Sequence, residues 1–215
     1  MSLKVNEIFY SIQGESSYAG RPCVFIRLTG CNLRCSYCDT KYAYNQGEER
    51  DIPEIMENVR QHMCHLVEVT GGEPLLQEDT HYLLEHLLDE DFEVLLETNG
   101  SKDISRVDRR CIKIVDIKCP SSGEVGRNDL KNLYRLSEND ELKFIIGDRR
   151  DYEYAKGILN LIRIDILKGA IINFSPSFGK MEPEELSDWI IKDKLNVRLN
   201  LQLHKYIWGP DKRGV

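Results

Sequence analysis

The sequence predicts an α/β fold in which parallel strands alternate with crossover helices, as either an open doubly wound sheet or a complete or partial barrel. Two observations support this prediction. Short runs rich in β-forming residues recur along the 215-residue chain, with amphipathic helical patterns between them. Polar or glycine-rich motifs come directly after several of these runs, as they do at the carboxyl ends of parallel strands. The length fits one domain of moderate size.

Seven β-rich runs bounded by turn-forming residues are expected to form strands. They cover residues 23–30, 66–72, 92–100, 111–118, 141–147, 169–176 and 197–208. Two short segments rich in glycine and polar residues, 47–51 and 121–126, are expected to be exposed loops.

Four segments with helical periodicity lie between these strands, at residues 52–63, 77–91, 150–162 and 182–195. In the second of them, four leucines between residues 83 and 88 make one apolar stripe, which indicates a helix packed against a sheet. Pro53 and Pro183 suit the first turns of their helices, where a backbone N–H has no partner within the helix.

The motifs that follow the strands would converge on one cavity, because the carboxyl ends of parallel strands share one rim. In chain order they are Cys31, Thr70 to Pro74, Glu97 to Gly100, Lys118, Ser175 with Pro176, and His204 with Lys205. The alternative is coincidence, since strands often end in glycine and proline in any case.

Composition and charge narrow the class of protein. Hydrophobic residues make up 41% of the chain and charged residues 30%, which excludes a disordered chain. The net charge of −7 argues against nucleic acid or an anionic membrane as a partner. No uncharged apolar run is long enough to cross a bilayer, and residues 1–16 lack the apolar core of a signal peptide. We therefore expect a cytoplasmic protein.

Three of the seven cysteines, Cys31, Cys35 and Cys38, lie within eight residues in the spacing C-x3-C-x2-C. Thiolates at this spacing suit an iron–sulfur cluster or zinc. Three ligands on a four-iron cluster would leave one iron open to a ligand from outside the protein. The alternatives are a zinc site completed by a distant His62, His65 or His204, and three thiols without a metal.

The cysteine spacing, with aromatic Tyr37 before the last cysteine, resembles the signature of the radical S-adenosylmethionine enzymes. In that family the open iron of a [4Fe-4S] cluster binds S-adenosylmethionine, and an electron from the reduced cluster cleaves it to a 5′-deoxyadenosyl radical. The segment VTGGEP at 69–74 is similar to the family's glycine-rich motif, in which Gly71 and Gly72 would let the backbone approach the bound methionyl group.

Within this superfamily the chain resembles the 7-carboxy-7-deazaguanine synthases over nearly its whole length. The shared segments include NEIFYSIQGES, LLETNG, DIKCPSSG, ELKFIIGD and LNLQLHKYIWGPDKRGV. The resemblance implies a carbon–nitrogen lyase that converts 6-carboxy-5,6,7,8-tetrahydropterin to 7-carboxy-7-deazaguanine with loss of ammonia, towards queuosine and other 7-deazapurines. It also implies a partial, open β/α barrel of about six parallel strands, magnesium, a homodimer, and a reducing partner such as a flavodoxin.

The same resemblance divides the chain into a single radical S-adenosylmethionine domain over residues 1–215, with an N-terminal substrate-binding segment and a C-terminal extension. It places the pterin near Ile12, Gln13, Gly14, Arg27, Thr70 and Pro210. The Gln13 amide offers a donor and an acceptor to a ring edge, and the Arg27 guanidinium can pair with a carboxylate. The alternatives are an exposed turn residue for Gln13 and a surface ion pair for Arg27.

The residues implied to hold S-adenosylmethionine lie at five places along the chain. They are Tyr37, Cys38, Asp39, Gly72, Asp116, Ile117, Lys118, Ser175, Pro176, Ser177 and Phe178. Cys31, Cys35 and Cys38 would bind the cluster. Thr40 corresponds to the magnesium ligand, and substrate oxygens and water would have to complete its octahedron.

Glu15 and Glu97 are the candidate catalytic carboxylates, because ring contraction and loss of ammonia require proton transfers. Alternatively, Glu97 anchors the cofactor or nearby backbone. Near the C-terminus, Tyr206 and Trp208 could close over the pterin, or lie in the core or a dimer interface.

The chain departs from the family pattern at three points. Ser16 stands where the N-terminal motif commonly has a second glycine, and Asp116 stands where the lysine motif often has serine. The chain also continues beyond Pro210 to Val215, which leaves the C-terminal substrate contact open. Two other functions remain at this point: an activase of glycyl-radical enzymes, and a zinc-stabilised binding module without catalysis.

Overall fold

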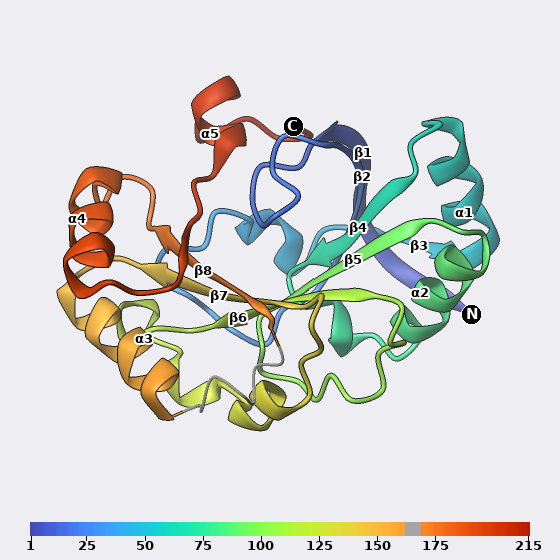
Figure 1. Cartoon of the computed structure of the whole chain (residues 1–215). Coiled ribbons are helices and arrows are strands. Elements are labelled where there is room, and N and C mark those ends of the chain that lie inside the picture. The colour runs from blue at the N-terminus through green and yellow to red at the C-terminus, as the bar shows by residue number, and fades with distance from the viewer. Residues whose placement is uncertain (162–168) are drawn as a thin grey trace.

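A computed structural model describes residues 1–161 and 169–215 and has one nine-stranded, open sheet (Figure 1). Its strand order is β3-β1-β2-β4-β5-β6-β7-β8-β9, so neighbours along the chain are mostly neighbours in the sheet. Six long parallel strands form the main body, which confirms the predicted partial barrel. They are β2 (Pro22–Leu28), β4 (Leu66–Gly71), β5 (Glu93–Thr98), β6 (Ile112–Ile117), β7 (Glu141–Ile146) and β8 (Ile171–Pro176).

The four predicted helices are present as α1 (Ile52–Gln61), α2 (Thr80–Asp89), α3 (Arg149–Leu161) and α4 (Pro183–Asp193). Ile162, the last residue of the third predicted helix, lies outside the described residues. The α1 helix begins where the Asp51 side chain accepts a hydrogen bond from Glu54 N, with Pro53 in the first turn. The large core lies between these helices and one face of the sheet. No helix among the described residues is long and apolar enough to span a membrane.

Two antiparallel strands at one edge of the sheet were not predicted. The first, β1 (Ser2–Ile12), pairs with β2, and β3 (Glu48–Asp51) pairs with β1. The prediction that residues 47–51 form an exposed loop is therefore wrong. Three of the four residues of β3, Glu-Glu-Arg-Asp, are exposed, and none of them is apolar. The strand therefore lacks the alternation of apolar and polar residues that predicts a strand, and only its backbone pairing identifies it.

The predicted strand at 197–208 is also wrong. Only β9 (Arg198–Leu199) pairs with β8, and residues 203–208 form the short helix α5 (Leu203–Trp208). The chain leaves the sheet at buried Asn200 and turns across the open end of the barrel, where Leu203 N donates to Gly14 O at 2.8 Å. Figure 1 shows α5 and the C-terminus on the opposite side of the sheet from α2 and α3.

Two crossovers differ from the expected alternation of strand and helix. The connection from β5 to β6 contains no α-helix, and the connection from β6 to β7 contains three 3-10 helices: η3 (Pro120–Ser122), η4 (Val125–Arg127) and η5 (Leu130–Tyr134). The predicted exposed loop at 121–126 is thus partly helical, and Ser122 within it is buried.

Side chains on the parallel strands alternate between the outer core and the inside of the barrel. On β4, Val67 and Val69 belong to the large core, whereas Leu66 belongs to a small apolar cluster that also includes Phe25, Leu95 and Ile114. Above this inner cluster the lining becomes polar.

Candidate active site

A cavity of about 650 Å³ lies at the carboxyl ends of the parallel strands. The polar motifs predicted to converge on one cavity contribute lining residues to it, except Ser175 with Pro176. Most of the predicted site residues line it: Ile12, Gln13, Gly14, Glu15, Arg27, Cys31, Cys35, Tyr37, Cys38, Asp39, Thr40, Thr70, Gly72, Glu97, Asp116, Lys118, Ser177, Phe178 and Pro210.

Three predicted cofactor residues do not line the cavity. The Ile117 side chain points into the large core, as expected for a strand residue between Asp116 and Lys118. Ser175 and Pro176 are buried at the end of β8, and Ser175 Oγ accepts a hydrogen bond from Asn200 Nδ2 at 3.0 Å.

The three clustered thiols differ from the other four cysteines in lining the cavity. Cys31, Cys35 and Cys38 are free and half-buried there, whereas Cys23, Cys111 and Cys119 are buried and Cys64 is half-buried outside the cavity. The clustered thiols lie on the loop after β2, where Leu33 N and Asn99 Nδ2 donate to Cys31 Sγ at 3.4 and 3.7 Å. Within the described ranges, no group of three His, Cys, Asp or Glu side chains is already gathered around a common metal position.

The donor set of the cysteine loop nevertheless fits an iron–sulfur cluster better than zinc. Three thiols of one loop face a single cavity, and two of the three histidines considered as a fourth zinc ligand lie elsewhere. The His62 ring stacks on Tyr10 with centroids 5.9 Å apart, and the His65 ring stacks on Phe92 at 6.3 Å.

The glycine-rich motif packs directly against the cysteine loop. A Cβ at Gly72 would lie 2.1 Å from Gly30 O and 2.7 Å from Cys31 Cβ. A Cβ at Gly71, where φ is 154°, would lie 2.2 Å from Leu28 O. These glycines therefore let β4 pack closely against β2 and the cysteine loop. This packing accounts for both glycines without reference to a bound cofactor.

Unpartnered buried polar atoms lie beside the cysteines. The Oη of Tyr37 and Oδ1 of Asp116 have no hydrogen-bond partner among the described residues. The other Asp116 oxygen accepts from Lys118 Nζ at 2.5 Å. Desolvation, the largest single cause, lowers the pKa of Lys118, but Asp116, Tyr37 and Cys35 together outweigh it, so the net shift is upward. This part of the cavity thus offers a cation, an acceptor and a phenol, which fits a ligand that carries amino, carboxylate and hydroxyl groups.

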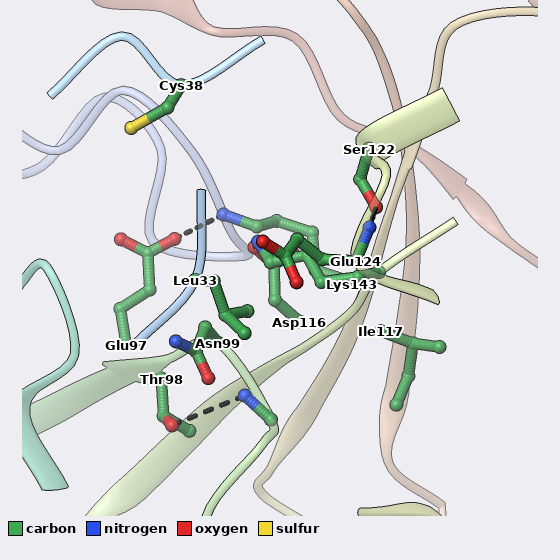
Figure 2. A network of polar contacts seen from close by, with 12 residues as sticks. Leu33, Cys38, Glu97, Thr98, Asn99, Asp116, Ile117, Ser122, Glu124 and Lys143 are labelled. Carbon is green, nitrogen blue, oxygen red and sulfur yellow. Dashed lines mark hydrogen bonds and ion pairs between the residues drawn. The ribbon is translucent and has the colours of Figure 1, made fainter. Parts of the chain in front are cut away.

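The centre of the cavity holds a buried lysine between two carboxylates. Lys143 Nζ donates to Glu15 Oε2 at 3.0 Å. It also donates to Glu97, and Figure 2 shows this contact. Thr70 Oγ1 donates to the second Glu97 oxygen at 3.1 Å, and Gln202 Nε2 donates to Glu15 Oε1 at 2.9 Å. Both candidate catalytic carboxylates are therefore held by one cation.

This arrangement shifts the pKa values of both partners. Desolvation alone would raise the pKa of Glu15, but Lys143 and His204 outweigh it and the net shift is downward. Desolvation also lowers the pKa of Lys143, whereas Asp116, Glu15 and Glu97 raise it well above its usual value. Glu15 is consequently ionised and Lys143 is charged at neutral pH.

Gln13 and Arg27 are neither exposed nor on the surface. Gln13 is buried; its Nε2 donates to Glu68 and its Oε1 accepts from Glu15 N at 2.9 Å. Arg27 Nε donates to Glu7 Oε1 at 2.8 Å, and its side chain is only 14% exposed. Tyr42 Oη donates to the same Glu7 oxygen at 3.0 Å.

The C-terminal segment closes one side of the cavity. A Cβ at Gly14 would lie 2.2 Å from His204 Nδ1, so the N-terminal segment and α5 are in direct contact. Lys205 Nζ donates to Asp39 Oδ2 at 2.5 Å and lies over the Phe178 ring. The Arg213 guanidinium lies 3.8 Å from the centre of the Tyr42 ring.

The two aromatic residues of α5 do not take part in this closure. Tyr206 is 57% exposed and Trp208 is 38% exposed, and neither lines the cavity. They are not core residues, which removes one of the alternatives considered for them.

Thr40 lines the cavity, and its Oγ1 lies 3.8 Å from Cys38 Sγ.

Sequence reasoning missed several residues that line the cavity: Glu68, Lys143, Gln202 and Tyr42. Glu68 and Lys143 lie inside strands rather than after them. Glu68 carried a detectable signal, because it is the one charge in an otherwise apolar strand, LVEVTG, whereas Lys143 shares its strand, ELKFII, with Glu141. A charge at such a position must face a polar interior or be paired.

Comparisons with known proteins agree with this geometry. Residues 25–119 match the Radical SAM superfamily. The 7-carboxy-7-deazaguanine synthase of Chlorobaculum tepidum is 49% identical over 217 residues, which cover 99% of this chain and 97% of that protein. Its counterpart from Koribacter versatilis is 42% identical over 227 residues, with 99% and 100% covered.

A solved structure has the same architecture. The crystal structure of QueE from Escherichia coli matches with a TM-score of 0.80 and 26% identity, and the match covers 95% of each chain. These matches favour neither a glycyl-radical activase nor a zinc-binding module. The chain belongs to the 7-carboxy-7-deazaguanine synthases, a family within the radical S-adenosylmethionine superfamily.

Proposed function

We propose that this protein converts 6-carboxy-5,6,7,8-tetrahydropterin to 7-carboxy-7-deazaguanine and releases ammonia. The observation that carries the proposal is the shared cavity, in which three free thiols lie with a buried amide, a guanidinium and a lysine-bridged pair of carboxylates. This combination supports radical chemistry on a polar heterocyclic acid. The full-length identity to named relatives supports the same reaction.

The cysteine side of the cavity would hold the cofactors. Cys31, Cys35 and Cys38 would bind the [4Fe-4S] cluster, and Tyr37, Asp116 and Lys118 would contact S-adenosylmethionine, together with Asp39, Gly72, Ser177 and Phe178. When bound, these groups supply the radical that starts the reaction. Magnesium belongs to the same proposal, with the Thr40 hydroxyl as a protein ligand and substrate oxygens and water as the others.

The opposite side would orient the pterin. Arg27 would receive the substrate carboxylate, since Glu7 holds its guanidinium at Nε and Tyr42 Oη donates to the same Glu7 oxygen. Gln13 keeps one N–H and one oxygen lone pair for the ring edge, because its other donor and acceptor positions are occupied by Glu68 and Glu15 N.

Glu15 and Glu97 would handle the protons of the ring contraction. The Glu15 carboxylate is ionised and can accept a proton at Oε1 or Oε2 from the substrate. Lys143 balances its charge and can return a proton from Nζ towards the nitrogen that leaves as ammonia. Ser17 and Asn173 satisfy the nearby Glu141, so that carboxylate is not available for the same task.

Three further properties follow from the same proposal. We infer that the protein acts as a homodimer, takes its electron from a reducing protein such as a flavodoxin, and works in the cytoplasm as one domain. The free thiols of all seven cysteines support a reducing compartment.

Anaerobic reconstitution tests the reaction. Protein loaded with iron and sulfide should form 7-carboxy-7-deazaguanine from the pterin when reductant, S-adenosylmethionine and magnesium are supplied. Elemental analysis should give about four irons per chain and no stoichiometric zinc. A loaded protein that consumes no pterin would refute the proposal.

The variant Cys35→Ala should abolish turnover, because it removes one of only three cluster ligands. Cys111→Ala is the matched control, since Cys111 is a buried thiol outside the cavity. Iron content and product formation measure both variants. Turnover by Cys35→Ala would contradict the assigned cluster site.

A further inference from the structure

Glu68 is a buried acid in the wall of the cavity that the proposed reaction does not use. It lies on β4 between Val67 and Val69, is only 3% exposed, and lines the cavity. Its Oε2 accepts a hydrogen bond from Gln13 Nε2. Among the residues that the structure describes, its other oxygen has no hydrogen-bond partner.

The charges around Glu68 leave it without a cation of its own. Glu97 on β5 and Glu15 after β1 face it as negative charges, while Arg27 on β2 and Lys143 on β7 face it as positive charges. Both cations are already paired, Arg27 with Glu7 and Lys143 with the two other carboxylates. An ionised Glu68 would therefore add a third negative charge to this part of the cavity.

Burial and the two neighbouring carboxylates outweigh the two cations at Glu68. Desolvation, the largest cause, raises its pKa, and Glu97 and Glu15 raise it further; Lys143 and Arg27 lower it, and the net shift is well above the usual value of 4.5. The thiol of Cys23, which also faces Glu68, is neutral because desolvation raises its pKa as well.

A neutral acid at this point would complete the hydrogen bonding of Gln13. The amide of Gln13 has two donors and an acceptor oxygen with two lone pairs. Glu68 takes one donor and Glu15 N fills one lone pair, so the orientation of the amide is fixed from two sides. One donor and one lone pair then remain for the cavity.

We propose that Glu68 is a positioning residue, held as a neutral carboxylic acid, that fixes the amide of Gln13 for recognition of the pterin ring edge. The proposal deepens the proposed function, because it rests on the pterin binding in this cavity. Its distinctive element is the protonated state, because a merely structural acid would have no effect on how binding varies with pH.

Infrared spectroscopy of the loaded enzyme without substrate tests the protonated state. The carbonyl band of a buried carboxylic acid should be present at neutral pH, disappear in Glu68→Gln, and shift in Gln13→Ala because the amide donor is lost. Glu141→Gln is the matched control, since Glu141 is a fully buried acid that does not line the cavity, and it should leave the band in place. A band that persists in Glu68→Gln, or none in the wild type, would overturn the proposal.

Binding of 6-carboxytetrahydropterin to the same proteins tests the positioning role. Glu68→Ala should raise the Kd by about tenfold, the effect of one lost hydrogen bond. Glu68→Gln keeps a neutral group with the same acceptor and should rescue most of this loss. The wild type should bind more weakly as the pH rises into the alkaline range, and Glu68→Gln should not.

The outcomes separate the two proposals. Equal Kd values for Glu68→Gln and Glu68→Ala, or the same alkaline weakening in Glu68→Gln as in the wild type, would refute the role of Glu68 alone. A wild type that binds no pterin would refute the proposed function, while the infrared band would still report the state of Glu68 and its contact with Gln13.

Discussion

Ser16 has a backbone conformation that glycine adopts more readily than any other residue. Its φ is 61°, it is 1% exposed, and its Oγ accepts a hydrogen bond from Tyr18 N at 3.2 Å. This is the position at which the family motif commonly has glycine, so the family pattern and the backbone angle agree. The hydroxyl, which satisfies a backbone donor, partly offsets the cost of the left-handed conformation.

Two substitutions at Ser16 separate the backbone from the hydroxyl. Ser16→Gly and Ser16→Ala both lose the Tyr18 contact, but only the glycine variant loses the Cβ. We expect Ser16→Gly to exceed Ser16→Ala by about 1 kcal/mol in free energy of unfolding, as measured in urea. Equal values would show that the left-handed angle costs nothing here.

The buried acid Glu68 should make the stability of the fold depend on pH. Its pKa is near 4.5 in the unfolded chain and well above that in the fold, so between the two values the folded state binds more protons. The free energy of unfolding should therefore fall as the pH rises above 4.5, by about 1.4 kcal/mol per pH unit until the folded pKa is passed.

Glu68→Gln removes this proton and should flatten that part of the profile. Urea unfolding between acid and neutral pH, compared with the wild type, measures the difference. If the difference in free energy of unfolding between Glu68→Gln and the wild type does not grow as the pH rises, Glu68 is ionised in the fold.

Single residues of the site differed in how far the sequence revealed them. Lys118 and Cys31 were predicted because they follow strands, where the shared rim of a parallel sheet brings distant motifs together. Glu68 and Lys143 were missed because they lie within strands, and their inward orientation depends on the register of the sheet. The contacts of Gln202 depend on how the C-terminal segment crosses the barrel, which no local pattern encodes.

At the scale of elements, buried strands were predicted well and edge strands poorly. The six central strands are rich in apolar residues, because one face of the sheet packs against the large core and part of the other face against the inner cluster. By contrast, β3 is charged and β1 is only partly buried, so their pairing depends on backbone hydrogen bonds. The α5 segment, LHKYIW, has enough β-forming residues to suggest a strand, but in the part of the chain that the structure describes no strand pairs with it.

The α3 helix contains a glycine that the fold does not require. Gly157 lies within α3 on an exposed position, and a Cβ there would meet nothing within 4 Å among residues 1–161 and 169–215. We expect Gly157→Ala to raise the free energy of unfolding by about 0.5–1 kcal/mol, because alanine loses less backbone entropy in a helix. Thermal and urea unfolding measure the change, and a loss of stability would indicate a neighbour that this position contacts.

At the scale of the whole molecule, the cavity depends on contact between two distant segments. Gly14 O accepts from Leu203 N at 2.8 Å, and the space beside the Gly14 Cα is filled by His204. Gly14→Ala should push α5 away and disturb Gln13 and Gln202 together. We expect kcat to fall by roughly a hundredfold, as for other misplaced positioning groups.

The control for this variant is Gly126→Ala. In contrast to Gly14, a Cβ at Gly126 would meet no described residue within 4 Å. Limited proteolysis should show earlier cleavage within residues 203–215 in Gly14→Ala but not in Gly126→Ala. Unchanged turnover in Gly14→Ala would mean that the contact with α5 is dispensable for the site.

The contact between Gly14 and α5 also bears on when the enzyme becomes competent during its synthesis. The six central strands can assemble once residue 176 has left the ribosome, but Gln202 reaches Glu15 only after about 26 more residues have emerged. A nascent chain would thus pass through a stage in which the six central strands are complete and the cavity still lacks one of its walls. If the cofactors bind at that stage, they bind before the cavity is able to bind the substrate.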